Sequence, residues 1–153
     1  MKYLPLGLDL RGRTCVVVGG GQVGTRKATT LLRAGATVTV ISPEATEEVA
    51  RLDRTGELHW RREGYRGSDL DGSFLAVAAT DDESLNARMV QDARARGVLV
   101  CDASSASRSE VIFGALHQGD GVTLAVFTDG RDPSLARKTR DRIADLNGEW
   151  EEK

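Results

Sequence analysis

Short apolar runs alternate with amphipathic stretches over the first two thirds of the chain. Four of the runs are almost continuously apolar, which is typical of strands buried on both faces of a parallel sheet. They cover residues 14–18, 38–41, 73–79 and 98–101. A fifth run, 57–61, alternates polar and apolar positions and predicts an edge strand.

The stretches between these runs have helical spacing. The first helix is expected directly after Gly24, with Ala28, Leu31 and Leu32 on one face, and it is expected to end at Gly35. Pro43 is expected to open a second helix over 44–54, and Asp81 or Asp82 to cap a third that carries apolar residues at 85, 89 and 93. The alternation of strands and helices from 14 to 102 predicts an α/β fold, a Rossmann-type doubly wound and mainly parallel sheet.

The pattern changes after Asp102. Residues 103–109 contain four serines and predict a loop. Two strands are then expected at 111–113 and 122–127 with a turn at 119–121, followed by a loop at 128–133, a helix at 134–146 and a frayed tail at 149–153. We therefore expect a dinucleotide-binding Rossmann domain over residues 1–110 and a short β-β-α extension over residues 111–153.

A glycine-rich turn joins the first strand to the first helix. Gly19, Gly21 and Gly24 have the G-x-G-x-x-G spacing of a dinucleotide-binding turn. In such a turn the first glycine permits the tight bend, the second lets the backbone approach a pyrophosphate, and the third lets the helix pack close to the strand. The alternative is a purely structural turn, but the flanking strand and helix favour a nucleotide site.

Other candidate cofactor contacts follow from the rule that ligands bind outside the carboxyl ends of parallel strands. The second strand ends in Ser42, Pro43 and Glu44, with no acidic residue where one usually contacts the adenosine ribose. Ser42 is either a ribose or 2′-phosphate contact or an ordinary helix-start residue. NAD and NADP are therefore both open, and Thr80 and Asp81 join the candidate cofactor contacts at the end of another strand.

Asp102 is the candidate catalytic carboxylate. It follows a buried strand at the edge where a nicotinamide is expected, and an apolar pocket can raise the pKa of a carboxyl enough for it to act as a general base. The alternative is an ordinary turn aspartate. Neither His59 nor His117 pairs with a visible nucleophile, so the sequence gives no support for a catalytic triad.

Composition narrows the function classes. The net charge of −2 gives no electrostatic argument for nucleic acid, and no apolar run is long enough to cross a bilayer. Cys15 and Cys101 lack metal-ligand spacing, which predicts buried free thiols in a reducing, cytoplasmic compartment and no metal site. Basic residues on the last helix are either a solvated face or a wall for an acidic ligand.

Taken together, several segments resemble one known family, the N-terminal dehydrogenase module of siroheme synthase (precorrin-2 dehydrogenase and sirohydrochlorin ferrochelatase). The resemblance covers about residues 1–146. It is carried by Tyr3-Leu-Pro-Leu6, Leu8-Asp-Leu-Arg-Gly-Arg13, Val16-Val-Val-Gly-Gly-Gly-Gln-Val-Gly-Thr-Arg-Lys-Ala28, Ala34-Gly-Ala-Thr-Val-Thr-Val40, Ala78-Ala-Thr-Asp-Asp82, Leu85-Asn86 and Asp132-Pro-Ser-Leu-Ala-Arg137.

The resemblance implies NAD-dependent oxidation of precorrin-2 to sirohydrochlorin. Asp102 matches the essential aspartate of the family and would act as the general base. Gln22, Val23, Pro43 and Glu44 match nucleotide contacts. The substrate is an acidic tetrapyrrole, so the substrate-binding candidates are Thr128, Arg131, Arg137 and Lys138. The family also implies a homodimer, formed through the segment after residue 110.

The chain departs from the family in three places. The loop after Asp102 is about two residues longer and lacks the usual proline, Gly114 replaces a proline, and two extra acids occupy the 128–132 loop. Within 153 residues the family's helical C-terminal region has little counterpart, which puts the ferrochelatase activity in question. Two alternatives therefore stay open: a binding module without turnover, or a chelatase with little redox activity.

Overall fold

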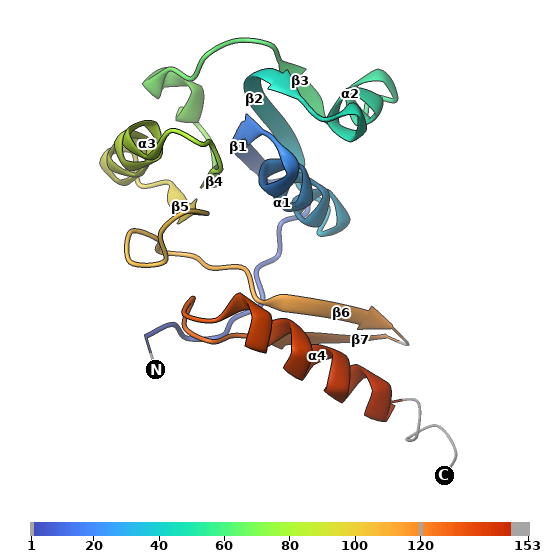
Figure 1. Ribbon diagram of the computed structural model, residues 1–153. Helices are drawn as coiled ribbons and strands as arrows, with labels where there is room; N and C mark the ends of the chain where they lie inside the picture. The colour runs from blue at the N-terminus through green and yellow to red at the C-terminus, as the bar shows by residue number, and fades with distance from the viewer. Residues whose placement is uncertain (1, 120, 148–153) are drawn as a thin grey trace. The chain divides into compact units, whose positions relative to one another are not determined.

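The computed structural model describes residues 2–119 and 121–147, and it contains a five-stranded sheet (Figure 1). The strands lie in the order β3-β2-β1-β4-β5, and every neighbouring pair is parallel. Their bounds are β1 Thr14–Gly20, β2 Thr37–Ala45, β3 His59–Arg61, β4 Leu75–Ala78 and β5 Leu99–Asp102. The predicted Rossmann-type parallel sheet is thus confirmed.

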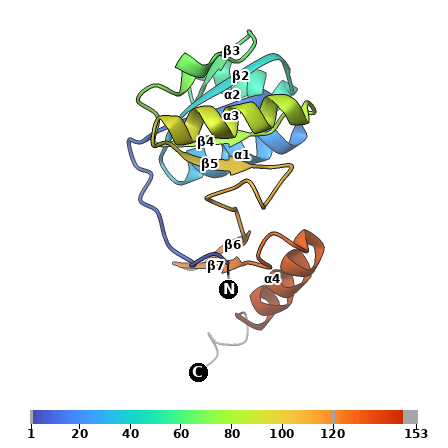
Figure 2. The ribbon, with the colours of Figure 1, turned by 90° about the vertical axis from the view of Figure 1, so that its left-hand side faces the viewer.

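Helices cover both faces of this sheet (Figures 1 and 2). They are α1 Gln22–Arg33, α2 Glu47–Arg54, the short 3₁₀ helix η1 Gly67–Leu70, and α3 Glu83–Ala95. The chain moves along the sheet in one direction from β1 to β3 and in the other from β4 to β5. Because such crossovers are right-handed, α1 and α2 lie on one face and α3, with η1 beside it, lies on the other.

The apolar runs supply the two cores on either side of the sheet. Val16 and Val18 of β1 pack toward α3, in a buried cluster with Leu70, Met89 and Val100. The alternate residues of β1 belong to the opposite face, where α1 contributes buried residues of its own. Each fully buried valine, leucine or methionine contributes roughly 1.5–3 kcal/mol through removal from water. This double-sided burial explains why β1 is continuously apolar.

The start of the second helix was predicted wrongly. Pro43 does not open a helix: β2 continues through Ala45, and α2 begins at Glu47. Thr46 is the N-cap, and its hydroxyl accepts a hydrogen bond of 3.4 Å from the Val49 N–H. Proline is tolerated in this strand because the β1 ladder skips 42–44, so the missing N–H of Pro43 costs no pairing.

The third helix agrees with the sequence reading. Asp82 is its N-cap, and the Asp82 carboxylate accepts a hydrogen bond of 3.0 Å from the Leu85 N–H. Apolar residues at helical spacing, Met89 and Ala93, are buried as expected.

The remaining chain contains a hairpin and a helix. Strands β6 Ala115–Gly119 and β7 Val122–Val126 are antiparallel, and α4 Pro133–Asn147 follows them. The strand expected at 111–113 is absent from the described residues, because Glu110 and Val111 instead donate backbone hydrogen bonds to the Val100 carbonyl. The expected frayed tail at 149–153 lies outside the residues that the structure describes.

By their internal packing, the residues divide into two compact units. One contains residues 7–111, and the other combines residues 1–6 with residues 112–153. The sheet, the glycine turn and Asp102 all belong to the unit 7–111. Residues 2–6 thus belong to the β6-β7-α4 unit, although the sequence had suggested only a boundary near residue 110.

Candidate active site

The carboxyl ends of all five strands meet at one edge of the sheet. The strand order reverses between β1 and β4, which makes the gap between their ends the switch point where open α/β sheets bind ligands. Val18, Ala78 and Asp102 lie at one level across β1, β4 and β5, because Ala78 pairs with both of the others. The glycine turn and Asp102 therefore share one edge.

The structure gives a different reason for glycine at each of the three motif positions. Gly19 has φ +109°, and a Cβ there would lie 2.3 Å from the Ala79 carbonyl oxygen. A Cβ on Gly24 would lie 1.9 Å from the Gly19 carbonyl oxygen, so only glycine lets α1 pack this close to the turn. A Cβ on Gly21 would meet nothing within 4 Å. The fold therefore does not need glycine at 21, which leaves a close backbone approach to a ligand as the reason for it.

Sequence reasoning missed two other features that fix the turn. A Cβ on Gly20 would lie 2.5 Å from the Glu44 carbonyl oxygen, so Gly20 allows the turn to pack on the end of β2. The buried Thr25 hydroxyl lies 2.8 Å from the Thr46 hydroxyl and donates to the Gly21 carbonyl at 2.9 Å. The run of three consecutive glycines, 19–21, was a usable signal for the first feature, whereas the threonine pair depends on tertiary contact alone.

The start of α1 fits the diphosphate of a dinucleotide. The first backbone hydrogen bond into the helix runs from Thr25 N–H to the Gly21 carbonyl, at 2.9 Å. The N–H groups of Gln22, Val23 and Gly24 therefore precede the intrahelical ladder, and the positive end of the helix dipole lies with them. Gln22 and Val23 are exposed at this turn. Such a helix start is a suitable anion-binding site.

The end of β2 places the candidate ribose contacts beside this turn. Ser42 is half-buried, and its carbonyl accepts a hydrogen bond of 3.0 Å from the Trp60 indole N–H. Pro43 and Glu44 are exposed, and the Glu44 backbone lies against Gly20. The Ser42 hydroxyl and the Glu44 carboxylate are thus the polar groups that β2 offers to a ribose.

The end of β4 supplies a polar rim on the other side of the switch point. The Thr80 hydroxyl donates to the buried side chain of Asn86 at 2.7 Å, and the Asn86 amide returns a bond of 2.9 Å to the Thr80 carbonyl. Asp81 is exposed beside it. The Asn86 amide also donates to the Ser104 hydroxyl at 3.4 Å, which ties the end of β4 to the loop after β5. Sequence reasoning assigned Asn86 no role.

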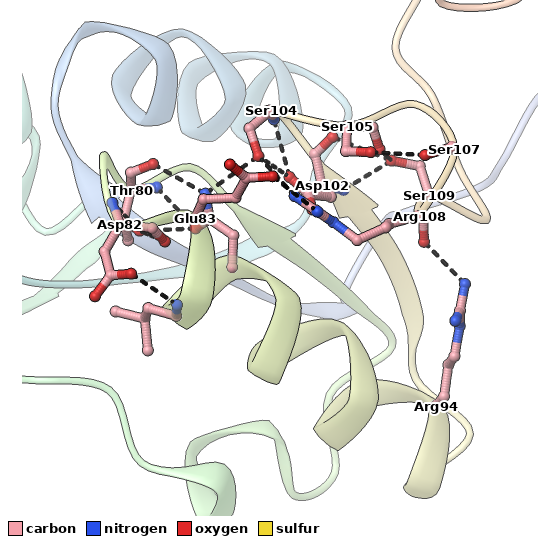
Figure 3. A network of polar contacts seen from close by, with 12 residues as sticks. Thr80, Asp82, Glu83, Arg94, Asp102, Ser104, Ser105, Ser107, Arg108 and Ser109 are labelled. Atoms are coloured by element: carbon pink, nitrogen blue, oxygen red, sulfur yellow. Dashed lines mark hydrogen bonds and ion pairs between the residues drawn. The ribbon is translucent and has the colours of Figure 1, made fainter.

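Asp102 lies at the centre of a network of hydrogen bonds (Figure 3). Its Oδ1 accepts from the Ser104 N–H at 2.9 Å and from the Ser104 hydroxyl at 2.6 Å. Its Oδ2 accepts from Arg108 Nε at 2.6 Å, and the Asp102 N–H donates to the Ser109 hydroxyl at 2.8 Å. The Asp102 side chain is 0% exposed. The loop 103–111 therefore encloses the carboxylate.

The direction of the Asp102 pKa is opposite to the expectation for an apolar pocket. Burial does act to raise the pKa of Asp102, but the hydrogen bonds from Ser104 and Arg108 outweigh burial and lower this pKa below its ordinary value. In this arrangement Asp102 is ionised at neutral pH, and it is a weaker base than a carboxylate in an apolar pocket.

The predicted substrate contacts lie in the other unit. The Thr128 hydroxyl donates to the Asp132 carbonyl at 2.8 Å, and it also accepts from the Asp132 N–H at 3.2 Å, so it stabilises the loop before α4. Arg131, Arg137 and Lys138 are exposed. The structure thus brings the cofactor candidates and Asp102 together on the unit 7–111, whereas the four substrate candidates belong to the other unit.

A cavity of about 440 Å³ lies beside the first turns of α3, lined by Gly64, Tyr65, Asp82, Ser84, Leu85 and Arg88. It contains none of the predicted site residues. Within residues 2–119 and 121–147, no group of three or more His, Cys, Asp or Glu side chains could hold a metal ion. No helix in the described part of the chain is long and apolar enough to cross a membrane.

Substitution of Gly21 by valine tests the role of the glycine turn. The valine side chain has open space and an ordinary backbone conformation, with φ −70° and ψ −174°, so the protein is expected to fold. The same side chain would occupy the space of the diphosphate, and we expect dinucleotide affinity to fall by about tenfold or more, which corresponds to at least about 1.4 kcal/mol. Isothermal titration with NAD and NADP measures this change.

Gly7→Val is the matched control, because a Cβ on Gly7 also meets nothing within 4 Å and Gly7 lies outside the glycine turn. Equal dinucleotide affinities for Gly21→Val and wild type would contradict the assignment of the turn.

Comparison with known proteins agrees with this geometry. Residues 6–115 match a family model described as putative NAD(P)-binding. The chain is 37% identical to a siroheme synthase of Photorhabdus laumondii over 100% of this chain and 35% of the relative. It is 42% identical to a siroheme synthase of Chromobacterium violaceum over 95% of this chain and 31% of the relative. The chain thus spans about a third of the length of these curated relatives.

A solved structure extends the similarity to the fold. The structure of SirC, a precorrin-2 dehydrogenase, matches with a TM-score of 0.82 and 31% identity, over 94% of this chain and 70% of that one. The match includes most of both units, and it confirms the resemblance derived from the sequence motifs. The chain therefore belongs to the siroheme synthase and precorrin-2 dehydrogenase family of NAD(P)-binding proteins.

Proposed function

We propose that this protein oxidises precorrin-2 to sirohydrochlorin with NAD as the hydride acceptor. The observation that carries the proposal is the placement of an open glycine turn and a conformationally fixed aspartate on one edge of the sheet, in a chain 31% identical to a precorrin-2 dehydrogenase. In the overall reaction, precorrin-2 and NAD⁺ give sirohydrochlorin, NADH and a proton. The bound dinucleotide would supply the nicotinamide ring that accepts the hydride.

The glycine turn and the neighbouring strand ends are proposed to hold the dinucleotide. The N–H groups at the start of α1 bind the diphosphate, and the open face of Gly21 allows its close approach. Ser42, Pro43 and Glu44 contact the adenosine ribose, and Thr80 and Asp81 border the cofactor at the end of β4. The choice of NAD over NADP comes from the family resemblance, because Ser42 is compatible with both.

Asp102 is the proposed acceptor of the proton that leaves the substrate. It lies at the end of β5, level with Ala78 at the edge where the cofactor binds. Its two bonds from Ser104 fix one carboxylate oxygen, so the other oxygen, Oδ2, is the one that would receive the proton. Because Arg108 covers Oδ2, this role requires the Arg108 side chain to move.

The acidic substrate is proposed to use the second unit as well. Thr128, Arg131, Arg137 and Lys138 are the proposed contacts for its carboxylates.

A homodimer is proposed through the same unit, supported by large apolar side chains that are exposed there: Leu116 39%, Val122 53%, Leu135 52% and Leu146 51%. Light scattering that gives the mass of a single chain would contradict the dimer.

A reducing compartment such as the cytoplasm is also proposed. It is supported by Cys15 and Cys101, which are buried and form no disulfide.

A second candidate function is a binding module without turnover. The observation that favours it is the complete burial of the Asp102 side chain beneath its hydrogen-bond partners. The two functions differ in one experiment, in which purified protein, NAD and freshly made precorrin-2 are mixed without oxygen. Formation of NADH supports the dehydrogenase. Thermal stabilisation by NAD without NADH formation supports the binding module.

A further inference from the structure

Arg108 separates Asp102 from solvent. The Asp102 side chain is 0% exposed, whereas that of Arg108 is 29% exposed and lies over it through the Nε–Oδ2 bond of 2.6 Å (Figure 3). The backbone of the loop is held independently of this bond: Arg94 Nη2 donates to the Arg108 carbonyl at 2.9 Å, and the Ser109 hydroxyl donates to the Asp102 carbonyl at 3.1 Å. The Arg108 side chain can therefore move without unfolding the loop, and an approaching ligand meets Arg108 before Asp102.

The Arg108 guanidinium is shared between two carboxylates in very different environments. Its Nε contacts the buried Asp102, while its Nη1 contacts Glu83 at 3.1 Å, and the Glu83 side chain is 77% exposed. An ion pair with so exposed a partner contributes little in water. A carboxylate of the ligand can therefore replace Glu83 at small cost. A guanidinium is also well suited to such an exchange, because its planar fork binds carboxylates through two parallel hydrogen bonds.

Asp102 keeps hydrogen-bond donors when Arg108 moves. The Ser104 N–H and hydroxyl donate to Oδ1 at 2.9 and 2.6 Å, so the carboxylate remains oriented with Oδ2 uncovered. Loss of a buried charge pair is costly when it leaves one charge without any partner, and these two bonds reduce that cost.

We propose that Arg108 is a specificity-determining residue of this reaction: its guanidinium binds a carboxylate of the acidic substrate, and in doing so it leaves Asp102 and uncovers the Oδ2 atom that accepts the proton. This inference rests on the proposed function. It assigns Arg108, which the sequence motifs did not single out, a direct contact with the substrate. It also explains how a fully enclosed carboxylate becomes accessible only when substrate is bound.

The exchange has a consequence for the strength of the base. Arg108 is one of the groups that lower the pKa of Asp102, so its departure raises that pKa and makes Asp102 a better proton acceptor in the substrate complex. The other charged or titratable groups around Asp102 are Glu83 at the start of α3, the Cys101 thiol on β5, and Lys27 on α1. The positive charge of Lys27 acts to lower the pKa of the Cys101 thiol. Of these groups only Glu83 loses a contact when Arg108 moves to the substrate, namely its 3.1 Å contact with Arg108 Nη1.

Kinetics of Arg108→Gln test the inference. In wild type the acid limb of kcat/KM, which reports the free enzyme, is expected at lower pH than the acid limb of kcat, which reports the substrate complex. In Arg108→Gln the kcat/KM limb is expected to move up to the kcat limb, because Arg108 no longer lowers the pKa of Asp102. KM for precorrin-2 is expected to rise about tenfold, the loss of one charge-assisted contact of about 1.4 kcal/mol.

Matched variants distinguish the loss of a substrate contact from a structural effect of the substitution. Arg96→Gln removes another guanidinium of similar exposure, 32%, that pairs with Asp71. In this variant neither KM for precorrin-2 nor the pH of the two acid limbs should change. Glu83→Gln removes the exposed competitor of the substrate carboxylate and should lower KM, but only in a protein that retains Arg108. Arg108→Lys should restore part of the wild-type KM. A lower kcat in Arg108→Gln, with unchanged KM and unchanged pH limbs, would overturn the inference.

A binding measurement keeps this test independent of turnover. Uroporphyrin, a porphyrin with eight carboxylates, is titrated into the full chain and followed by quenching of tryptophan fluorescence. Weaker binding by Arg108→Gln than by wild type and Arg96→Gln is expected. Equal affinities, or no binding by any of the three, would overturn the inference. Failure of the proposed function has a different signature, because wild type would then form no NADH from precorrin-2 whatever the titration gives.

Discussion

Asp102→Asn is expected to lower the turnover of precorrin-2 by roughly 10²- to 10⁴-fold, the usual contribution of a general base. An amide has nearly the shape of the carboxylate but does not accept the substrate proton at neutral pH. Because Asp102 lies on β5 and the glycine turn follows β1, the affinity for NAD should change little. Steady-state NADH formation and calorimetric titration with NAD measure the two quantities separately.

Asp71→Asn is the control for this prediction, because it removes an exposed carboxylate that pairs with Arg96 away from the edge. Its turnover should equal that of wild type. The fold of Asp102→Asn is checked by circular dichroism, since the change leaves Arg108 without its buried counter-charge. Turnover near the wild-type value in a folded Asp102→Asn protein would end the assignment of Asp102 as the base.

Gly24→Ala is expected to destabilise the unit 7–111 by about 3 kcal/mol or more, at or above the upper end of overpacking costs. The new Cβ would lie 1.9 Å from the Gly19 carbonyl oxygen, which is a backbone atom and cannot move aside by changing a rotamer. Total stabilities of about 5–15 kcal/mol make such a loss large. Urea unfolding followed by far-ultraviolet circular dichroism gives the free energy of unfolding.

Gly21→Ala provides the comparison within the same turn. No atom lies within 4 Å of the position of its Cβ, so its free energy of unfolding should stay within about 1 kcal/mol of the wild-type value, the usual range for a change of N-cap residue. A Gly24→Ala protein as stable as Gly21→Ala would show that α1 does not need its close approach to the turn.

The parts of the site that depend on local pattern were predictable from the sequence. The apolar run of β1 reflects burial on both faces of the sheet, and the glycine spacing reflects the close packing of Gly24 in α1 against the Gly19 carbonyl. Both constraints act on neighbouring residues. The N-cap role of Asp82 was also readable, because capping is local. The start of α2 is also determined by local residues, because Thr46 followed by two acidic residues is a better signal for a helix N-terminus than Pro43.

The surroundings of Asp102 were not predictable in the same way. Arg108 lies six residues further along a serine-rich loop with no periodicity, and only the folded loop brings it to 2.6 Å from the carboxylate. The direction of the Asp102 pKa was therefore missed, because it depends on hydrogen-bond donors and not on burial alone. The strand expected at 111–113 failed for a related reason, because the Val111 N–H donates to the Val100 carbonyl of β5, a tertiary contact that the local pattern does not show.

The measurement that tests the proposed dehydrogenase most directly is the anaerobic absorbance change after mixing the full chain with precorrin-2 and NAD, with NADP in a parallel reaction. We expect the NADH band and the sirohydrochlorin spectrum to grow in equal amounts with wild type, and both to be lost in Asp102→Asn. A flat NADH band with both nucleotides, from folded protein that still binds dinucleotide, would contradict the proposed function.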